Sequence, residues 1–404
     1  MERNVRPQGT RAFFRLLVLT ALGFVLGTYE FVVVGILPEI AEGMQVSLAA
    51  VGKLVSAFAG AYAVGTPFLT AAMGRIPRFR LLMELMAAFM GTTALSMLAP
   101  NVAVLYLSQM LAALVSGPLT AVGMLFAREL AEEGHAARAL AMVYAGFSLA
   151  SLVGVPLGTA VCRWLGWRWT YGMILLMSAA LLPVLAAILP RNTAVPMEKA
   201  GVLHAFTVFR DRRCALCAGM IFFSGTATYM VYTFLTPIMT DLLGVPADAV
   251  SLLLVVVGVC CMGSNLISGW MGERGGVRWL PLIFGMQALL FAAMPLLLLR
   301  GTWTGLAALL AMSLLMYVLN TPSQLYALTL AEREYPFATV LCSSMLSVCY
   351  NLGIAVGSFL GSGLQETAGL GGLGVPAAVF ALVGLGLNLL LLRADTWRAA
   401  ETAS

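Results

Sequence analysis

Glu30 is the residue of this sequence with the most distinctive chemistry, because it is the only charge in the interior of an apolar stretch from about Phe13 to Leu37. Placing a carboxylate at bilayer depth costs roughly 3 kcal/mol on insertion scales, so such a group normally faces a protein interior or a wet cavity. A carboxyl group whose surroundings alternate between dry and wetted can bind and release a proton. We expect Glu30 to couple protons to a solute. The alternatives are solute hydrogen bonding without protons and a structural role beside a neighbouring helix.

Hydrogen-bonding side chains also recur at helical spacing inside other apolar stretches. One set, Tyr317, Asn320 and Gln324, falls at i, i+3 and i+7 and therefore shares one face of a helix, and a second set near residue 226 has the same spacing. Buried amides and phenols need partners, which either a cavity with a polar solute or a neighbouring helix supplies. The candidate substrate-binding residues are Tyr29, Gln109, Thr226, Tyr229, Thr233, Tyr317, Asn320, Gln324, Tyr350 and Asn351.

The elements that must position these residues are membrane-spanning helices. Hydrophobic residues make up 61% of the 404 residues and charged residues only 10%, and the mean hydropathy is +0.94, which is outside the range of soluble domains. Apolar runs of about 20 residues match a hydrocarbon core of about 30 Å. We predict an all-α membrane protein with twelve transmembrane helices, centred near residues 25, 61, 90, 114, 150, 180, 226, 260, 290, 316, 350 and 383.

The basic residues predict how these spans are oriented. With twelve spans, 19 of the 23 lysines and arginines fall on the side that holds both termini, and only Lys53, Arg163, Arg168 and Arg300 fall on the other. The positive-inside rule then places both termini in the cytoplasm. We expect a multi-pass protein of the cell inner (plasma) membrane. The basic N-terminus resembles a signal peptide, but its span is long and lacks a cleavage pattern, so we interpret it as an uncleaved anchor. The formal charge of +5 follows from topology and needs no nucleic-acid partner.

An internal repeat divides the chain into two halves. Residues that recur at an offset of 199 are Pro38 with Pro237, Arg75 with Arg274, and Gly154 and Gly158 with Gly353 and Gly357. We predict an N-terminal six-helix bundle over 1–189, a cytoplasmic linker over 190–214, and a C-terminal six-helix bundle over 215–404. Parallel repeats of this kind bind solute at their interface in secondary transporters. The same offset relates Tyr229 to Glu30, which predicts that the two face each other across the pseudo-axis.

The basic loops after spans two and eight resemble a signature loop of the major facilitator superfamily. Residues 269–278 read Gly-Trp-Met-Gly-Glu-Arg-Gly-Gly-Val-Arg and are similar to G-x-L-x-D-R-x-G-x-R, with Glu in place of Asp, whereas residues 74–80 keep the basic positions without the acid. The resemblance covers nearly the whole chain and implies two pseudo-symmetric six-helix bundles. We expect the basic residues to stabilise the outward-facing state or to act only as topology signals. The gating candidates in these loops are Arg75, Arg78, Glu273, Arg274 and Arg278.

Span five resembles the Gly/Pro-rich motif of proton-driven antiporters, which implies export. Its residues 154–158 read Gly-Val-Pro-Leu-Gly, in which the glycines let helices approach closely and Pro156 lets the helix bend. Together with Tyr29-Glu30-Phe31, the motif resembles the arabinose-efflux-permease-like branch, whose members are associated with export of sugars, nucleosides or drugs. Related antiporters often carry an arginine where this chain has Gln109, a neutral amide that can bind solute but cannot switch charge. The gating candidates here are Gly154, Pro156 and Gly158.

These observations predict a secondary active transporter that exports small organic solutes in exchange for protons by alternating access. A facilitator or proton symporter would share the fold, and a non-transporting receptor would bind solute without flux. The sequence contains no metal set, nucleophile triad or phosphate loop, so we expect no enzyme activity, cofactor or metal. Cys214 and Cys217 form a C-x-x-C pair without a second ligand pair, and we interpret them as small apolar helix residues. We expect a monomer that binds protons, a small-molecule substrate and the lipid bilayer.

Overall fold

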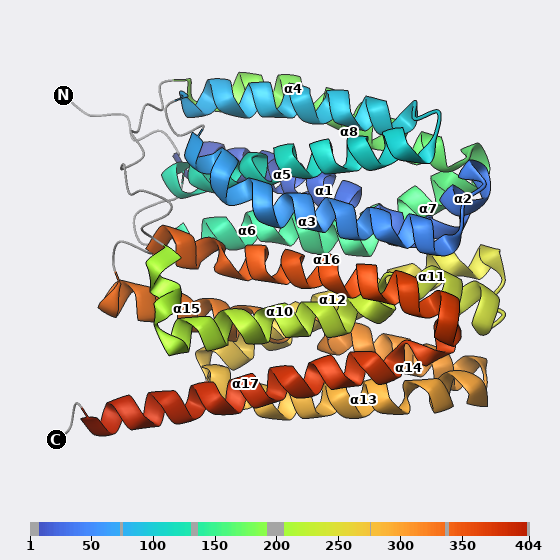
Figure 1. Cartoon of the computed structure of the whole chain (residues 1–404). Coiled ribbons are helices and arrows are strands. Elements are labelled where there is room, and N and C mark those ends of the chain that lie inside the picture. The colour runs from blue at the N-terminus through green and yellow to red at the C-terminus, as the bar shows by residue number, and fades with distance from the viewer. Residues whose placement is uncertain are drawn as a thin grey trace.

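The structure is a computed structural model, and it describes residues 8–72, 76–130, 136–191, 206–274, 276–335 and 339–401. Over these residues the chain is helical and contains no strand. Figure 1 shows long helices lying side by side, with the start of α1 and the end of α17 at the same end of the molecule. We call this end the termini end and the opposite one the far end. An even number of crossings brings both termini to one side, as the twelve-span prediction requires.

The helices of the first half occupy the upper part of Figure 1, and those of the second half occupy the lower part. We call these groups the N half and the C half. The N half contains α1 (Gln8–Gly35), α2 (Leu37–Met44), α3 (Leu48–Ala72), α4 (Arg78–Met97), α5 (Val102–Leu130), α6 (Ala136–Leu149), α7 (Val155–Leu165) and α8 (Trp167–Ile188). The C half contains α10 (Arg212–Tyr232), α11 (Leu235–Pro237), α12 (Ala247–Glu273), α13 (Leu280–Arg300), α14 (Thr302–Leu315), α15 (Asn320–Glu334), α16 (Thr339–Gly372) and α17 (Gly374–Glu401).

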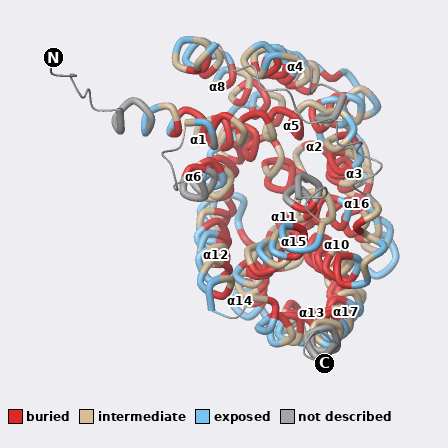
Figure 2. The backbone as a smooth tube through the Cα atoms, turned by 90° about the vertical axis from the view of Figure 1, so that its left-hand side faces the viewer, coloured by how far each residue is buried: buried red, intermediate tan, exposed pale blue. Residues whose placement is uncertain are grey.

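Eleven stretches of helix in the described residues are long and apolar enough to cross a membrane, counting α6 with α7, and α14 with α15, as one stretch each. The twelfth predicted span is α4, which carries Arg78, Arg80 and Glu84 in its first two turns and packs against α5 and α8. Arg80 Nε donates to Glu84 Oε1 at 2.7 Å on the exposed face. Figure 2 shows buried residues on the inward sides of the helices and exposed ones outside. Leucines such as Leu289 and Leu299, 73% and 76% exposed, suit contact with lipid.

The segment between the halves is only partly described, because residues 192–205 lie outside the described residues. A short 3-10 helix, η2 (Phe206–Arg210), precedes α10. Asp211 is the N-cap of α10, where its carboxylate accepts a hydrogen bond from the Arg213 backbone N–H at 2.8 Å. Helix α10 therefore begins at Arg212, inside the range 190–214 given to the linker.

Glycines allow close helix contacts at equivalent places in the two halves. A Cβ on Gly154 would lie 2.1 Å from Thr28 Oγ1 of α1, and a Cβ on Gly158 would lie 2.4 Å from Val32 Cγ2. In the C half a Cβ on Gly353 would lie 2.3 Å from the Phe222 carbonyl oxygen of α10. Each glycine-bearing helix thus packs directly against the first helix of its half, as close small-residue packing in membranes allows.

Two spans are interrupted near their middle. The fifth span consists of α6, a π-helical stretch η1 (Ala150–Gly154) and α7, and Pro156 lies in the first turn of α7. The break therefore uses both a π-bulge and a proline, which are recognised causes of helix bending. In the tenth span α14 ends at Leu315 and α15 begins at Asn320, with a turn between them.

The turn over residues 316–319 corrects one sequence prediction. Tyr317, Asn320 and Gln324 were assigned to one face of a continuous helix, and this was wrong because the helix is broken between the first two. Side chains of neighbouring helices satisfy the freed backbone groups, as transmembrane breaks require. The serines 264 and 268 of α12 accept from the backbone N–H groups of residues 317 and 321 at 2.8 Å each, and Gln287 Nε2 of α13 donates to the Leu315 carbonyl at 3.1 Å.

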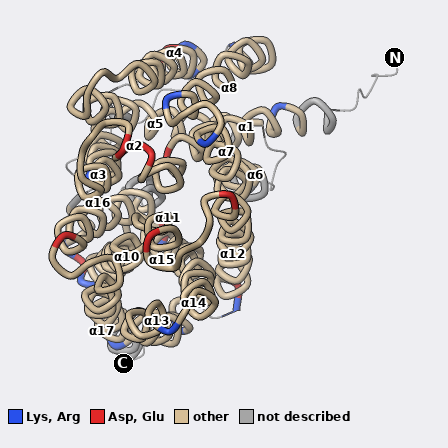
Figure 3. Tube along the Cα trace, turned by 90° about the vertical axis from the view of Figure 1, so that its right-hand side faces the viewer, with Lys and Arg blue, Asp and Glu red and all other residues tan. Residues whose placement is uncertain are grey.

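Several contacts join the N half to the C half at the far end. Thr236 Oγ1 donates to the Val34 carbonyl at 2.9 Å, which joins α11 to the end of α1. Arg163 of α7 forms an ion pair with Asp248 at the start of α12. Figure 3 faces this end and shows acidic residues on α2 among few other charges. The two halves are therefore in direct contact at the far end, which we call the closed end.

The ion pair between Arg163 and Asp248 is expected to contribute little to stability, because the Asp248 side chain is 85% exposed. We predict that Asp248→Asn lowers the free energy of unfolding by less than about 1 kcal/mol. Thermal unfolding of purified protein measures this, and wild type in high salt should approach the variant because salt screens exposed charges. A loss of several kcal/mol would contradict this assignment and make the pair a principal support of the closed end.

Candidate functional site

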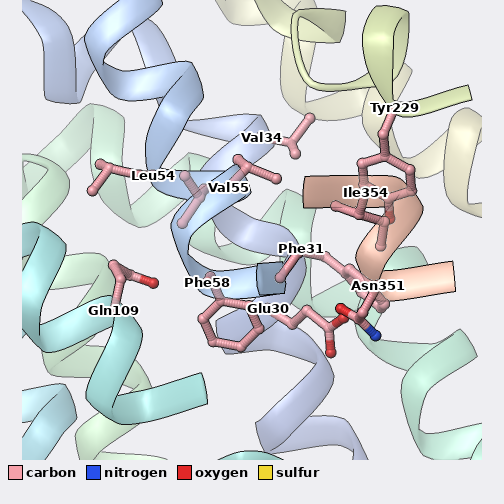
Figure 4. Close-up of a pocket in the computed structure, with 12 residues that line it drawn as sticks. Glu30, Phe31, Val34, Leu54, Val55, Phe58, Gln109, Tyr229, Asn351 and Ile354 are labelled. Atoms are coloured by element: carbon pink, nitrogen blue, oxygen red, sulfur yellow. The ribbon is translucent and has the colours of Figure 1, made fainter. Parts of the chain in front are cut away.

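A small cavity lies between the two halves, and Glu30 is on its wall (Figure 4). The N half contributes Glu30 of α1, the apolar face of α3 and Gln109 of α5, and the C half contributes Tyr229 of α10 and Asn351 of α16. Water-sized molecules can place their centres in about 20 Å³ of it, about the room that one ordered water needs. The cavity is therefore nearly closed, and an organic solute fits only if the halves move apart.

Glu30 and Asn351 are two of the four polar residues that line this cavity. Figure 4 shows the Glu30 carboxyl group and the Asn351 amide pointing toward one another from α1 and α16. Among the described residues no lysine, arginine or histidine forms an ion pair with Glu30. Asn351 Nδ2 donates to the Ser347 carbonyl at 3.0 Å, while its Oδ1 is buried and accepts no hydrogen bond from the described residues. A carboxyl group and an unsatisfied amide oxygen thus meet where the halves touch.

Tyrosines form the C-half side of the site. Tyr229 lines the cavity, and its ring centroid lies 6.0 Å from that of Tyr350, edge to face. Tyr317 lies 6.3 Å from Tyr350, and Tyr232 lies 5.3 Å from Tyr229. The sequence prediction included three of these tyrosines but not Tyr232, which its spacing did not place on the same face. Tyr229 and Glu30 line the same cavity, which brings together the two positions related by the offset of 199.

Gln109 and Tyr29 belong to a polar network inside the N half. Gln109 Nε2 donates to the Tyr171 hydroxyl at 2.9 Å. The Tyr29 hydroxyl and Ser96 Oγ form a hydrogen bond of 2.8 Å. The rings of Tyr29 and Tyr171 lie 5.6 Å apart. Tyr29 is fully buried and is absent from the cavity wall, whereas Gln109 reaches it. Tyr171 and Ser96 gave no sequence signal, because a tyrosine and a serine in an apolar helix are common.

The remaining candidates do not line the cavity. Thr226 Oγ1 donates to the Phe222 carbonyl within α10 at 3.0 Å, and Thr233 donates to the Tyr229 carbonyl at 2.7 Å and lies 2.8 Å from Ser358 Oγ of α16. Both threonines are buried between α10 and α16. Asn320 starts α15, and its buried Oδ1 accepts no hydrogen bond from the described residues. Gln324, one turn further along α15, is likewise absent from the cavity wall.

The described gating candidates of the two basic loops lie at the termini end. Arg78 at the start of α4 forms an ion pair with Glu129 near the end of α5, which joins two helices of the N half. Arg274 lies over the Trp270 ring, 5.0 Å from its centroid, and Glu273 beside it is exposed. Arg278 lines a second pocket, described below. Arg75 lies outside the described residues.

Most of the cavity wall is apolar, and the sequence prediction did not include it. The residues concerned are Phe31, Val33, Val34, Leu54, Val55, Phe58, Ala59 and Ile354. Such residues resemble every other apolar position of a span, so no signal of residue type separates them. Only the crossing of α1, α3 and α16 identifies them. Among the described residues no group of three or more His, Cys, Asp or Glu side chains could hold a metal ion.

Glu39, at the far end in α2, is a half-buried acid outside the cavity. Its Oε2 is buried without a hydrogen-bond partner among the described residues. Burial raises the pKa of Glu39, and the nearby Glu42 raises it further, while its own backbone N–H and Arg163 partly oppose this. The folded protein therefore binds this proton more strongly than the unfolded chain does.

Stability should consequently fall as the pH rises from the unfolded pKa of Glu, near 4.3, through the raised pKa of Glu39. We predict that Glu39→Gln removes this part of the pH dependence and makes the variant more stable than wild type at neutral pH. Thermal unfolding at a series of pH values measures it, with Glu366→Gln, an exposed acid on α16, as the matched control. An unchanged pH profile in Glu39→Gln would show that the unfolded and folded chains hold this proton equally.

Comparison with known proteins identifies the class that this fold and cavity define. The family model of the Major Facilitator Superfamily matches residues 19–220, which is half of the chain, so the chain belongs to this superfamily. That part of the sequence prediction is confirmed, while the arabinose-efflux branch stays a prediction. The chain is 29% identical over 382 residues to the uncharacterized MFS-type transporter YtbD of Bacillus subtilis (strain 168), covering 90% of this chain and 93% of that protein.

Further relatives share the full length. The uncharacterized MFS-type transporter YbcL of Bacillus subtilis (strain 168) is 25% identical over 391 residues, covering 96% of this chain and 98% of that protein. The fold matches a bacterial homolog of the human lysosomal transporter Spinster in an inward-facing and unoccupied conformation, with a TM-score of 0.73 and 16% identity over 95% of this chain and 98% of that one. It also matches the nucleoside transporter NupG, with a TM-score of 0.74 and 13% identity over 94% and 99%. These likenesses show that the chain shares the fold of these two solved structures.

Proposed function

We propose that this chain is a proton-coupled antiporter that exports small organic solutes by alternating access. The observation that carries the proposal is the position of Glu30: its carboxyl group lies in the cavity between the halves, and no cation of the described residues forms an ion pair with it. A carboxyl group there is dry when the halves close around it and wet when they part. Its protonation can therefore follow the conformation of the transporter.

The proposed cycle uses competition for Glu30. A solute that enters from the termini end, which we place in the cytoplasm, displaces the proton from Glu30 and occupies the space between α1 and α16. Closing the termini end and parting the contacts at the far end, such as Thr236 with Val34, releases the solute outside. A proton from outside then returns Glu30 to its neutral form. The net result is exchange of one solute for a proton at a single site.

The chemistry of the cavity favours solutes that donate hydrogen bonds. Its polar groups are the Glu30 carboxyl, the unsatisfied Asn351 Oδ1, the Gln109 amide and the Tyr229 hydroxyl. Among the described residues no lysine or arginine lines it. Carboxylates and amide oxygens accept hydrogen bonds, so amines, polyols and nucleosides suit the cavity better than carboxylates or phosphates. The apolar wall suits an amphipathic solute.

The test is solute-driven proton flux. Purified protein in liposomes with an internal pH probe would be exposed to matched solutes with an amine, a polyol, a nucleoside or a carboxylate, with and without an imposed proton gradient. Proton movement that starts on adding a donor-rich solute supports antiport. Solute flux that does not depend on the proton gradient would contradict antiport and establish a facilitator. The neutral Gln109, whose amide N–H is already bonded to Tyr171, favours the facilitator as the second candidate, since it cannot switch the charge beside Glu30.

A further inference from the structure

A second and larger pocket lies inside the C half at the termini end. It is bounded by α15, α17 and the short 3-10 helix η4 (Gly276–Trp279), and Figure 2 faces the end of the molecule where it lies. Water-sized molecules can place their centres in about 480 Å³ of it, against about 20 Å³ in the cavity beside Glu30. Pockets that bind small molecules span about 300 to 1,000 Å³. The two share no wall residue, so this pocket is separate from the site between the halves.

Opposite charges line this pocket without neutralising each other. Arg278 comes from η4 and Asp395 from α17, and among the described residues no ion pair joins them within 4.0 Å. Tyr326 of α15 donates to Asp395 Oδ1 at 2.7 Å, which orients the carboxylate on the pocket wall. The guanidinium offers up to five donors to an anion. A ligand that carries both charges could bind both groups.

The rest of the wall combines apolar side chains with a hydroxyl group. Leu325 and Leu392 provide apolar surface, and Thr329, one turn after Tyr326 on α15, adds a hydroxyl group. We infer that this pocket binds a small zwitterion, with an ammonium group beside Asp395 and a phosphate group beside Arg278. The same chemistry occurs in soluble phosphoethanolamine and in the headgroup of an ethanolamine phospholipid.

Occupancy of the pocket would act on the transport site through α15. This helix begins directly after the break at residues 316–319, where Tyr317 joins the tyrosines beside the cavity. Across the pocket, the hydrogen bond from the Tyr326 hydroxyl to the Asp395 carboxylate joins α15 to α17. A bound zwitterion would add a second bridge between η4 and α17, beside α15. Binding shifts a conformational equilibrium only when the two states bind the ligand differently, and the pocket changes shape whenever α15 moves.

The first arm of the test uses soluble ligands on the purified full-length protein. Titration calorimetry should show saturable binding of phosphoethanolamine, with phosphate alone and ethanolamine alone each at least about tenfold weaker, because each lacks one charge-assisted contact. Arg278→Gln and Asp395→Asn should each weaken phosphoethanolamine binding about tenfold or more. Asp395→Asn keeps an acceptor for Tyr326, so its fold should be retained. Arg300→Gln and Glu366→Gln, both at the far end, are the matched controls and should bind as wild type does.

The second arm distinguishes the source of the ligand. Protein in nanodiscs that contain ethanolamine or choline phospholipids would be released and examined for retained lipid by native mass spectrometry. Selective retention of the ethanolamine lipid, lost in Arg278→Gln and in Asp395→Asn, would support the zwitterion site and assign the lipid headgroup as its ligand. Binding of soluble phosphoethanolamine alone would support the site with a cytosolic ligand. Absence of binding in both arms, or binding that neither variant weakens, would overturn the inference.

Discussion

Glu30→Gln is expected to abolish solute-driven proton movement while the protein still binds solute. Glutamine keeps the size and the acceptor oxygen of the side chain but cannot take up or release a proton. Loss of the only titratable carboxyl on the cavity wall should therefore uncouple the transporter, lowering proton flux to the level of empty liposomes. Solute counterflow across liposomes without a proton gradient should continue, because it requires alternation of the halves and not proton transfer.

Glu84→Gln is the matched control for this variant. Glu84 is also an acid within a span, but it lies on the exposed face of α4 and pairs with Arg80 at i, i+4. An exposed pair of this kind contributes little to stability because solvent screens it, so coupling and stability should match wild type. Proton flux retained by Glu30→Gln would contradict the coupling role. Equal loss in both variants would point to a general effect on folding, which thermal unfolding of each protein would reveal.

The sequence predicts the fold well because membrane insertion depends on properties that are local in the chain. A span needs about 20 apolar residues, so each of the twelve helices is visible without knowledge of its neighbours. Even α4, whose first turns carry Arg80 and Glu84, is a helix in the structure, since its charged residues lie at one end and reach outward. The offset of 199 between Gly154 and Gly353 likewise reflects packing against the first helix of each half.

The candidate site is predicted only in part, because it depends on contacts between distant segments. Glu30 is visible as a lone charge, but its neighbour Asn351 is more than 300 positions away and only the crossing of α1 and α16 brings them together. Tyr29, adjacent to Glu30 in sequence, points into the N half and bonds Ser96. The break after Leu315 is also hidden from periodicity, since the serines that support it belong to α12. The polar residues of one helix do not indicate which neighbouring helix provides their hydrogen-bond partners.

Gly353→Ala is expected to destabilise the protein strongly and to abolish transport. A Cβ there would lie 2.3 Å from the Phe222 carbonyl oxygen and 3.0 Å from the Thr226 backbone nitrogen. Both atoms belong to the backbone of α10, so no side chain can turn aside and the two helices must separate. Overpacking of this kind costs about 1–3 kcal/mol or more, and it would displace Asn351, two residues away, from Glu30.

Gly363→Ala on the same helix separates the effect of overpacking from the effect of helix propensity. An added Cβ at Gly363 meets nothing within 4 Å, and alanine is favoured over glycine inside a helix by up to about 1 kcal/mol. The melting temperature should therefore fall in Gly353→Ala and stay level or rise in Gly363→Ala, with solute counterflow lost only in the first. Equal stability of the two variants would mean that α10 and α16 are not held at the observed spacing. Loss of counterflow in a stable Gly353→Ala protein would instead show that this contact must close and reopen during transport, since a helix pair that folds but cannot approach fully would leave the cavity unable to seal.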